Sequence, residues 1–347
     1  MLNDRQGMMR CGTCVEPGVF ALLDYPIPRV APVGHLLVDI AAIGLCGTDY
    51  HIFEGKHPYL TYPRVIGHEL SGTVTEGGYG FQTGQLVVIN PYISCGKCRA
   101  CQRMKPNCCV AIGVLGVHRD GGMCSRIAVP AQNLIVADGL TPIQAAMVEF
   151  LAIGAHAVRR AGEMGKGDKV LVTGAGPIGL GTALFARLTG ADVHLLDVSS
   201  PRLAAAQAGF GFEKLYRPGE PLLLDEQADG FDFVFDATGN ATAIEAGFAY
   251  VAHGGTYVLV SVVKDNITFA DAEFHKREMR LIGSRNALAV DFQHVMAALA
   301  SGRIDSDRLV STILTLDELP ARLPALAADR EGIIKAIVAI SNIKGAV

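Results

Sequence analysis

The sequence predicts an α/β protein of two domains, a mostly β domain and a doubly wound parallel sheet. Its 347 residues are more than a single hydrophobic core usually organises. Short strand-like runs separated by Gly and Pro fill the first part of the chain. Strand and helix patterns then alternate from about residue 169 to residue 284. Such alternation is typical of a parallel sheet covered by helices.

In the first part, three runs bounded by turn residues predict strands, and together they predict a compact β domain with a barrel-like core. These runs are HLLVDIAAIG (35–44), GHELSGTV (67–74) and GQLVVINPY (84–92). Residues 141–162 change to the apolar spacing of helices, which marks the approach to the second domain.

In the second part, apolar runs predict the buried strands of the parallel sheet, with helices from about Pro177 and over residues 201–211. The expected strands are 169–174, 192–198, 231–239, 255–261 and 280–284. The tail, residues 287–347, predicts helices and a last apolar strand, IIKAIVAI (333–340), that packs back on the first domain. The predicted domains are therefore 1–152 with 287–347, and 153–286.

Composition excludes several classes of function. The net charge of -4 disfavours a nucleic-acid partner bound through a basic surface. No run of about 18 or more apolar residues is present, so we expect no membrane span. The N-terminus lacks a basic and then apolar signal pattern, so the sequence predicts a cytoplasmic protein. In such a chain, nine cysteines indicate metal binding or chemistry more than disulfides.

A Gly-rich motif follows the expected strand 169–174 and opens a helix. Gly174 permits the tight turn, Gly176 lets the backbone approach a pyrophosphate, and Gly179 allows helix and strand to pack closely. Pro177 and Ile178 begin the helix, whose N-terminus offers free N–H groups to phosphates. The motif therefore predicts a dinucleotide site, and an ordinary Gly-rich turn without a ligand is the alternative.

Asp197 ends the next expected strand and favours NAD over NADP. Its carboxylate can accept hydrogen bonds from the adenosine ribose hydroxyls and would repel a 2′-phosphate. Arg202 lies five residues further on. It could meet a phosphate, although we expect it to lie along the adenine or in solvent.

Four cysteines within fifteen residues predict a structural zinc site. Cys95, Cys98, Cys101 and Cys109 supply four soft ligands, which suit a closed tetrahedral centre. Cys108 is a rival for the fourth position. An iron–sulfur cluster or a zinc ribbon that contacts nucleic acid are the alternatives.

A second metal site is predicted from ligands that lie far apart in the sequence. Cys46, His68 and Glu149 can hold a catalytic zinc with one coordination position open for substrate. Glu69 is a rival oxygen ligand, and Asp49 could orient His68. A buried cysteine and a satisfied core histidine are the alternatives for Cys46 and His68 taken singly.

With these motifs the chain resembles the zinc-dependent medium-chain dehydrogenases/reductases over nearly its whole length. The sorbitol, polyol and sugar-acid branch is the most similar, because Glu149 stands where that branch carries a glutamate zinc ligand. LGVHRDGG (115–122) and GSRNA (283–287) resemble the hexonate 5-dehydrogenases, such as those for L-gulonate or L-galactonate. The resemblance rests on GLCGTDYH (44–51), GHE (67–69), the cysteine cluster (95–109), VEFLAIGAHAVRR (148–160), GAGPIG (174–179) and DATG (236–239).

The resemblance implies a GroES-like catalytic domain (1–152 and 287–347), a Rossmann domain (153–286), two zinc ions, NAD and a homodimer or homotetramer. Thr48 would take the alcohol proton and pass it through the cofactor ribose to His51. Alternatively, Glu69 and a zinc-bound water would serve the relay. The implied activity is hydride transfer between a secondary alcohol of a polyol or sugar acid and NAD.

The substrate pocket is less defined by the sequence. Arg285, which could pair with a hexonate carboxylate, is the first candidate, and Asn286 and His118 are weaker ones. An L-threonine or small-alcohol dehydrogenase is a rival function, as is a dinucleotide-sensing relative without turnover. Cys11 and Cys14 form a CxxC pair that we expect to be structural.

Overall fold

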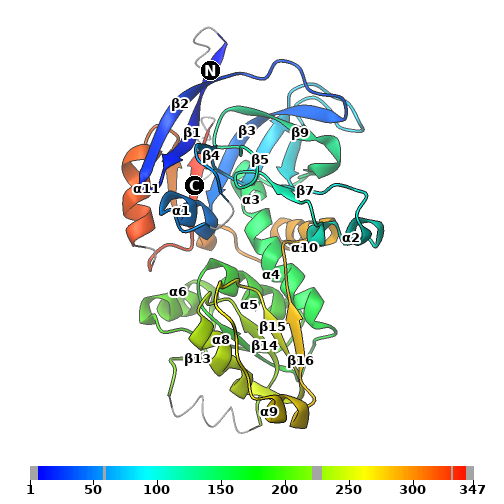
Figure 1. Cartoon of the computed structure of the whole chain (residues 1–347), viewed down its shortest axis with the longest axis vertical. Coiled ribbons are helices and arrows are strands. Elements are labelled where there is room, and N and C mark those ends of the chain that lie inside the picture. Colours follow the sequence, from blue (N-terminus) through cyan, green and yellow to red (C-terminus); the bar gives the residue numbers. More distant parts are fainter. Residues whose placement is uncertain (1–6, 58–59, 221–228, 330, 341–347) are drawn as a thin grey trace. The chain divides into compact units, whose positions relative to one another are not determined.

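The computed structural model describes residues 7–57, 60–220, 229–329 and 331–340 (Figure 1). The chain divides into two compact units. Unit 1 comprises Met1–Glu149 and Leu288–Val347, and unit 2 comprises Phe150–Ala287.

Unit 1 is mostly β structure, and its strands form three sheets among the described residues. The strands are β1 Met8–Glu16, β2 Val19–Pro26, β3 His35–Leu45, β4 Arg64–Val65, β5 Glu69–Val74, β6 Leu86–Ile89, β7 Tyr92–Ile93, β8 Gly113–Val114, β9 Arg126–Pro130, β10 Leu134–Val136, β17 Val310–Thr315 and β18 Lys335–Ala339. The largest sheet has the order β10-β6-β5-β3-β18-β17, with β9 also paired to β3. The others are β2-β1-β4 and β7-β8.

Short helices join these strands. In unit 1 they are α1 Gly47–Phe53, α2 Arg99–Gln102, α3 Pro142–Ala146, α10 Ala289–Ala300 and α11 Leu319–Ala328, with 3-10 turns at Pro106–Cys108, Ala131–Asn133 and Asp307–Leu309. Thr141 caps α3, since its hydroxyl accepts from the Gln144 N–H and its own N–H donates to the Gln144 side chain. The expected helical stretch 141–162 therefore contains two helices, α3 and then α4 (Val148–Ala161).

The C-terminal strand completes the main sheet of unit 1. β18 pairs antiparallel with β3, so that Ala336 lies opposite Leu45 and Ile337 opposite Gly44. The expectation that the last apolar strand returns to the first domain is confirmed. Because β3 also pairs with β5, it lies in the middle of β5-β3-β18.

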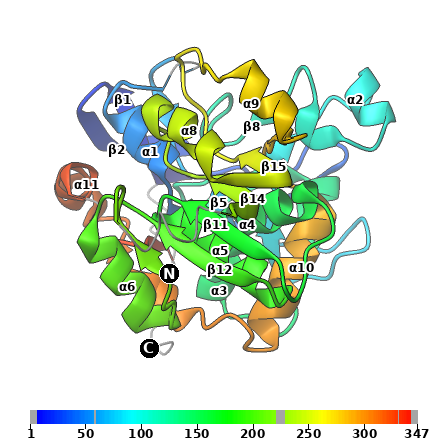
Figure 2. The same ribbon diagram turned by 90° about the horizontal axis from the view of Figure 1, so that it is seen from below.

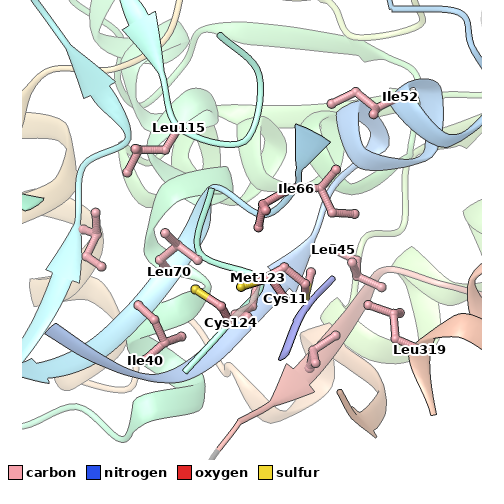
Figure 3. Packing of buried hydrophobic residues seen from close by; sticks show 14 of the residues in the cluster. Cys11, Ile40, Leu45, Ile52, Ile66, Leu70, Leu115, Met123, Cys124 and Leu319 are labelled. Carbon is pink, nitrogen blue, oxygen red and sulfur yellow. The ribbon is translucent and has the colours of Figure 1, made fainter. Parts of the chain in front are cut away.

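Apolar side chains fill the interior of unit 1, and sulfur-bearing residues lie among them (Figure 3). Cys11, Met123 and Cys124 are each at most 2% exposed and pack in one hydrophobic cluster. Cys14 belongs to the same cluster and is fully buried. Burial raises the pKa of Cys14 to about 12, with a further contribution from the charge of Asp49. A buried thiol with so high a pKa is a poor nucleophile, which supports the structural role expected for the CxxC pair.

Unit 2 is a parallel sheet with helices between its strands (Figure 2). The strand order is β13-β12-β11-β14-β15-β16 in the described part of the unit. The strands are β11 Lys169–Thr173, β12 Asp192–Leu196, β13 Leu215–Tyr216, β14 Phe231–Asp236, β15 Val251–Leu259 and β16 Arg280–Gly283, and the further helices are α5 Pro177–Leu188, α6 Ser200–Phe210, α8 Ala241–Gly247 and α9 Asp271–Lys276, with a 3-10 turn at Phe248–Tyr250. The doubly wound parallel sheet is thus confirmed.

Two features of the strands differ from expectation. The N-terminal hairpin β1–β2 was not among the strands expected from periodicity, because β2 is exposed or half-exposed throughout and lacks the signal of a buried face. β15 begins at Val251 and not at residue 255, since Gly254 and Gly255 interrupt the apolar run that marks the strand. No described helix is both long enough and apolar enough to cross a bilayer.

Candidate active site

Cys46 and His68 are brought together at the ends of two neighbouring strands. Cys46 follows β3 and begins α1, and His68 immediately precedes β5. Ligand atoms of Cys46, His68 and Glu69 all lie within 4.8 Å of one another. The sequence placed the first two in a zinc site, and the structure puts them within reach of a common ion.

Asp49 connects the two loops that carry these ligands. Its Oδ2 accepts from the Cys46 N–H at 2.9 Å, and its Oδ1 accepts from the Gly67 N–H at 3.2 Å. The same Oδ1 lies 3.6 Å from Nδ1 of His68. The side chain of Asp49 is fully buried, and burial raises its pKa above the usual range. Asp49 therefore connects the loop of Cys46 with the loop of His68, and its Oδ1 lies beside the imidazole that the sequence predicted it to orient.

The pKa of His68 reflects the negatively charged groups around it. Burial by itself lowers the pKa of His68, but the charge of Asp49, followed by Cys46 and Glu149, more than offsets burial and raises it well above its usual range. Nδ1 of His68 is buried and has no hydrogen-bond partner among the described residues. A thiol, an imidazole and nearby carboxylates whose ligand atoms lie this close together are a donor set that suits zinc, so the residues fit the metal.

Glu149 lies in the first turn of α4, close to this group but outside the set that shares the 4.8 Å limit. Its Oε1 accepts a hydrogen bond from the Tyr92 hydroxyl. The pKa of Glu149 is raised to about 7, because burial and the charge of Glu69 together outweigh the lowering effect of His68. Tyr92, which sequence reasoning missed, packs edge-on against Phe292 with ring centroids 6.5 Å apart. No local motif marks Tyr92, because its role depends on pairing with a helix 57 residues away.

Glu69 has a different environment from Glu149. Both of its carboxylate oxygens accept from Nζ of Lys335 at 2.7 Å, and both side chains are at most 2% exposed. From the sequence, Glu69 is a candidate for the proton relay or a rival ligand of the catalytic zinc. Lys335 was also missed, because a single lysine within an apolar strand carries no recognisable signal.

The relay candidates lie on α1. Thr48 is half-buried and His51 is exposed, three residues further along the helix. Residues at this spacing lie on the same face of a helix. The arrangement places an exposed imidazole one turn beyond a hydroxyl.

The cysteine cluster forms a compact group of four thiols. The sulfur atoms of Cys95, Cys98, Cys101 and Cys109 lie within 4.8 Å of one another, with 3.5 Å between Cys98 and Cys101. The N–H groups of Cys95 and Ala111 both donate to the Cys109 sulfur. Cys108 is exposed and lies outside the group, so the geometry favours Cys109 as the fourth ligand. Backbone hydrogen bonds lower the pKa of Cys98 to about 6, which favours the thiolate needed for zinc.

The Gly-rich turn of unit 2 has the geometry that a pyrophosphate site requires. Gly174 has a φ of 91°. A Cβ on Gly179 would lie 1.7 Å from the Gly174 carbonyl oxygen, whereas a Cβ on Gly176 would meet nothing within 4 Å. Pro177 and Ile178 open α5, and the Ile178 carbonyl accepts from Thr182. The close packing at Gly179 and the open space at Gly176 match the roles expected from the motif.

Asp197 stands just beyond β12 beside this turn. Its Oδ2 accepts from the Ala175 N–H at 2.6 Å, and its Oδ1 accepts from the Ser199 N–H at 2.8 Å. Nη1 of Arg202 lies 3.8 Å from Asp197 Oδ2. The Arg202 side chain therefore lies beside the Asp197 carboxylate and remains one-third exposed to solvent.

Asp236, in the DATG motif, has a structural role that the motif alone did not reveal. It is fully buried and accepts from the hydroxyls of Thr173, Thr238 and Ser261. It thereby joins the ends of β11, β14 and β15 beneath the cofactor turn.

The substrate candidates are not brought together within one unit. Nδ1 of His118 accepts from the Val114 N–H at 3.2 Å, so this ring closes its own turn in unit 1. Arg285 and Asn286 follow β16 in unit 2, where Arg285 is exposed and Asn286 has a φ of 52°.

Comparison with known proteins agrees with this description. Residues 32–139 match the alcohol dehydrogenase GroES-like domain, and residues 177–301 match the zinc-binding dehydrogenase domain. The L-galactonate-5-dehydrogenase of Escherichia coli K12 is 41% identical over 316 residues, which cover 86% of this chain and 89% of that protein.

Two solved structures have the same fold along almost the entire chain. A zinc-binding dehydrogenase of Sinorhizobium meliloti 1021 bound to NADP has a TM-score of 0.87 and 30% identity, covering 96% of this chain and 100% of that one. The L-idonate 5-dehydrogenase of Escherichia coli K-12 has a TM-score of 0.88 and 26% identity, covering 96% and 98%. The chain belongs to the zinc-binding alcohol dehydrogenase family with a GroES-like domain. It is a zinc-dependent dehydrogenase of the medium-chain type, with a nicotinamide cofactor and a small-molecule substrate.

Proposed function

We propose that this enzyme oxidises a secondary alcohol of a hexonate, at C5 of an L-galactonate-type sugar acid, with NAD as the acceptor. The observation that carries the proposal is the half-buried Cys46 next to the buried His68, with Glu149 beside them, in a chain 41% identical to an L-galactonate-5-dehydrogenase. A polyol is the neighbouring substrate class, since it offers the same secondary alcohol without the carboxylate.

In this proposal Cys46, His68 and Glu149 hold the catalytic zinc, and Cys95, Cys98, Cys101 and Cys109 hold the structural zinc. When bound, zinc polarises the substrate hydroxyl and NAD accepts the hydride. Asp49 keeps the two ligand loops together, and Tyr92 orients the Glu149 carboxylate. Thr48 would take the alcohol proton and pass it through the cofactor ribose to His51, which is exposed on the same helix face and would release it to solvent.

Asp197 supports NAD as the cofactor. Its carboxylate is 6% exposed and held by the amides of Ala175 and Ser199 at the end of β12. A carboxylate fixed at this point can accept hydrogen bonds from the ribose hydroxyls, and its negative charge repels a 2′-phosphate. Because a related structure is bound to NADP, the preference of this enzyme for NAD over NADP is tested by measuring rates with both cofactors.

The test is NADH formation by the purified, zinc-replete protein on L-galactonate, L-gulonate, L-idonate, sorbitol, simple alcohols and L-threonine, with NADP in parallel. We expect the highest kcat/KM for one of the three hexonates with NAD. Cys46→Ala serves as the control and should abolish turnover. Full activity of Cys46→Ala, or a clear preference for L-threonine or a simple alcohol, would overturn the proposal.

The enzyme is also proposed to be a cytoplasmic homo-oligomer, either a dimer or a tetramer. Among the described residues, β16 is an edge strand of the parallel sheet, and Leu281 on it is 40% exposed. An edge strand with an exposed apolar side chain is a natural site for pairing between copies. Size-exclusion chromatography with light scattering tests the oligomeric state, and a monomer at micromolar concentration would contradict it. Cell fractionation tests the cytoplasmic location.

A further inference from the structure

Lys335 is a charged residue in the middle of the main sheet of unit 1, at the start of β18. It is 2% exposed and ranks among the largest fully buried side chains. Its Nζ donates to both oxygens of Glu69 at 2.7 Å and to the Leu45 carbonyl at 3.2 Å. A lysine ammonium has three N–H donors and no acceptor, so all of these contacts are donated by Lys335.

The ion pair spans a strand that lies between its two partners. Glu69 is on β5 and Lys335 on β18, and both strands pair with β3. Gly44 of β3 lies directly opposite Glu69. A Cβ on Gly44 would fall 2.0 Å from Oε2 of Glu69. The missing side chain of Gly44 therefore leaves the room through which Glu69 reaches Lys335.

This arrangement matters because two carboxylates compete for one metal. Glu69 lies within 4.8 Å of ligand atoms of Cys46 and His68, whereas Glu149 falls outside that limit. On distance alone Glu69 would be the third ligand. However, the charge of Glu69 is balanced by a buried ammonium, and Glu149 is bound by the neutral hydroxyl of Tyr92.

We infer that Lys335 is a positioning residue that decides which carboxylate binds the catalytic zinc. By donating to both oxygens of Glu69, it balances the charge of this carboxylate and competes with the metal for it, and so leaves Glu149 as the third protein ligand. The inference rests on the proposed function in one respect, that Cys46 and His68 hold zinc. A buried charge without its partner is strongly unfavourable, so removal of Lys335 makes the metal the best available partner for Glu69.

The test uses protein with cobalt in the catalytic site and zinc in the cysteine cluster. Cys46→Ser removes the catalytic contribution, and its absorption spectrum is subtracted from that of each variant. Lys335→Met should shift the visible cobalt bands, because an oxygen ligand enters the coordination sphere, and should lower kcat by roughly 10-fold or more. The double variant Lys335→Met with Glu69→Gln should recover the wild-type spectrum, and Glu69→Gln alone should leave it unchanged. Lys214→Met removes a lysine paired with Asp192 on the surface of unit 2 and is the matched control.

A folded Lys335→Met protein with the wild-type spectrum overturns the inference, as does a double variant that keeps the shifted bands. Lys335→Gln, which retains a hydrogen-bond donor without the charge, allows the same comparison if the methionine variant does not fold. The proposed function fails separately: in that case, wild-type protein and Cys46→Ser have identical spectra, because no metal is bound at Cys46.

Discussion

The backbone N–H of Ala175 donates to Oδ2 of Asp197 at 2.6 Å, so a hydrogen bond joins the Gly-rich turn to the acid that follows the next strand. The other carboxylate oxygen is held by the Ser199 N–H. Asp197 is thereby aimed by two amides, and its negative charge stays next to the loop that would receive the pyrophosphate.

Asp197→Asn tests this charge. We expect kcat/KM with NAD to fall by about 10-fold, because hydrogen bonds to a charged acceptor are worth roughly 1.5–3 kcal/mol. Use of NADP should rise, since the repulsion of a 2′-phosphate is removed. Initial rates with each cofactor measure both effects. Asp192→Asn alters an acid near the other end of β12 and should leave the NAD/NADP ratio unchanged. An unchanged ratio in Asp197→Asn would contradict the assignment.

Two glycines of the turn should respond differently to the same substitution. Gly176→Ala should leave the melting temperature of the cofactor-free protein unaltered, because the new Cβ meets nothing within 4 Å, but should weaken NAD binding. Gly179→Ala should lower stability by about 1–3 kcal/mol, since its Cβ would lie 1.7 Å from a carbonyl oxygen. Thermal melts with and without NAD separate the two. Normal NAD affinity in Gly176→Ala would mean that the phosphates lie elsewhere.

The geometry of the cysteine cluster predicts that substitutions of the adjacent residues Cys108 and Cys109 affect zinc binding differently. Cys109→Ser should lose one zinc per chain and unfold at a lower temperature, because Cys109 belongs to the four-thiol group. Cys108→Ser should retain all its zinc, because Cys108 is exposed and outside that group. Elemental analysis after dialysis against a weak chelator distinguishes the variants. Equal zinc contents would show that either cysteine can complete the site.

Tyr92→Phe isolates the hydrogen bond to Glu149. We expect catalytic zinc to bind roughly 10-fold more weakly, because groups that orient a metal ligand commonly contribute this much. Competition with a chromophoric chelator measures the affinity. Tyr257→Phe is the matched control: it removes a buried hydroxyl bonded to the Ile244 carbonyl in unit 2, and should reduce stability without changing zinc affinity. Equal effects of the two variants on zinc would leave Tyr92 without a special role.

Arg285→Ala should discriminate between the two substrate classes. If Arg285 binds the hexonate carboxylate, kcat/KM should fall by roughly 10- to 100-fold for the hexonate and much less for sorbitol, which lacks a carboxylate. Arg280→Ala, a nearby exposed arginine on β16, serves as the control. Equal losses on hexonate and sorbitol would assign Arg285 to the cofactor or to the fold.

The sequence by itself determined the fold class, and it predicted the dinucleotide turn, the cysteine cluster and a metal site that includes Cys46 and His68. These features are readable because each rests on local chemistry: a strand followed by a spaced run of glycines, four thiols within fifteen residues, and ligands at the ends of expected strands. The geometry of the Gly-rich turn and of the cysteine cluster follows from short stretches of backbone, whereas Cys46 and His68 meet because β3 and β5 are neighbours.

Tertiary structure alone decided the environment of the two competing glutamates. Lys335 meets Glu69 across 266 residues, and Tyr92 meets Glu149 across 57. Each contact depends on strand register and on where a helix begins, and a shift of one residue in β18 would turn Lys335 to the other face of the sheet. The choice of Cys109 over Cys108 is of the same kind, because adjacent residues point in different directions and only the folded loop shows which one faces the other thiols.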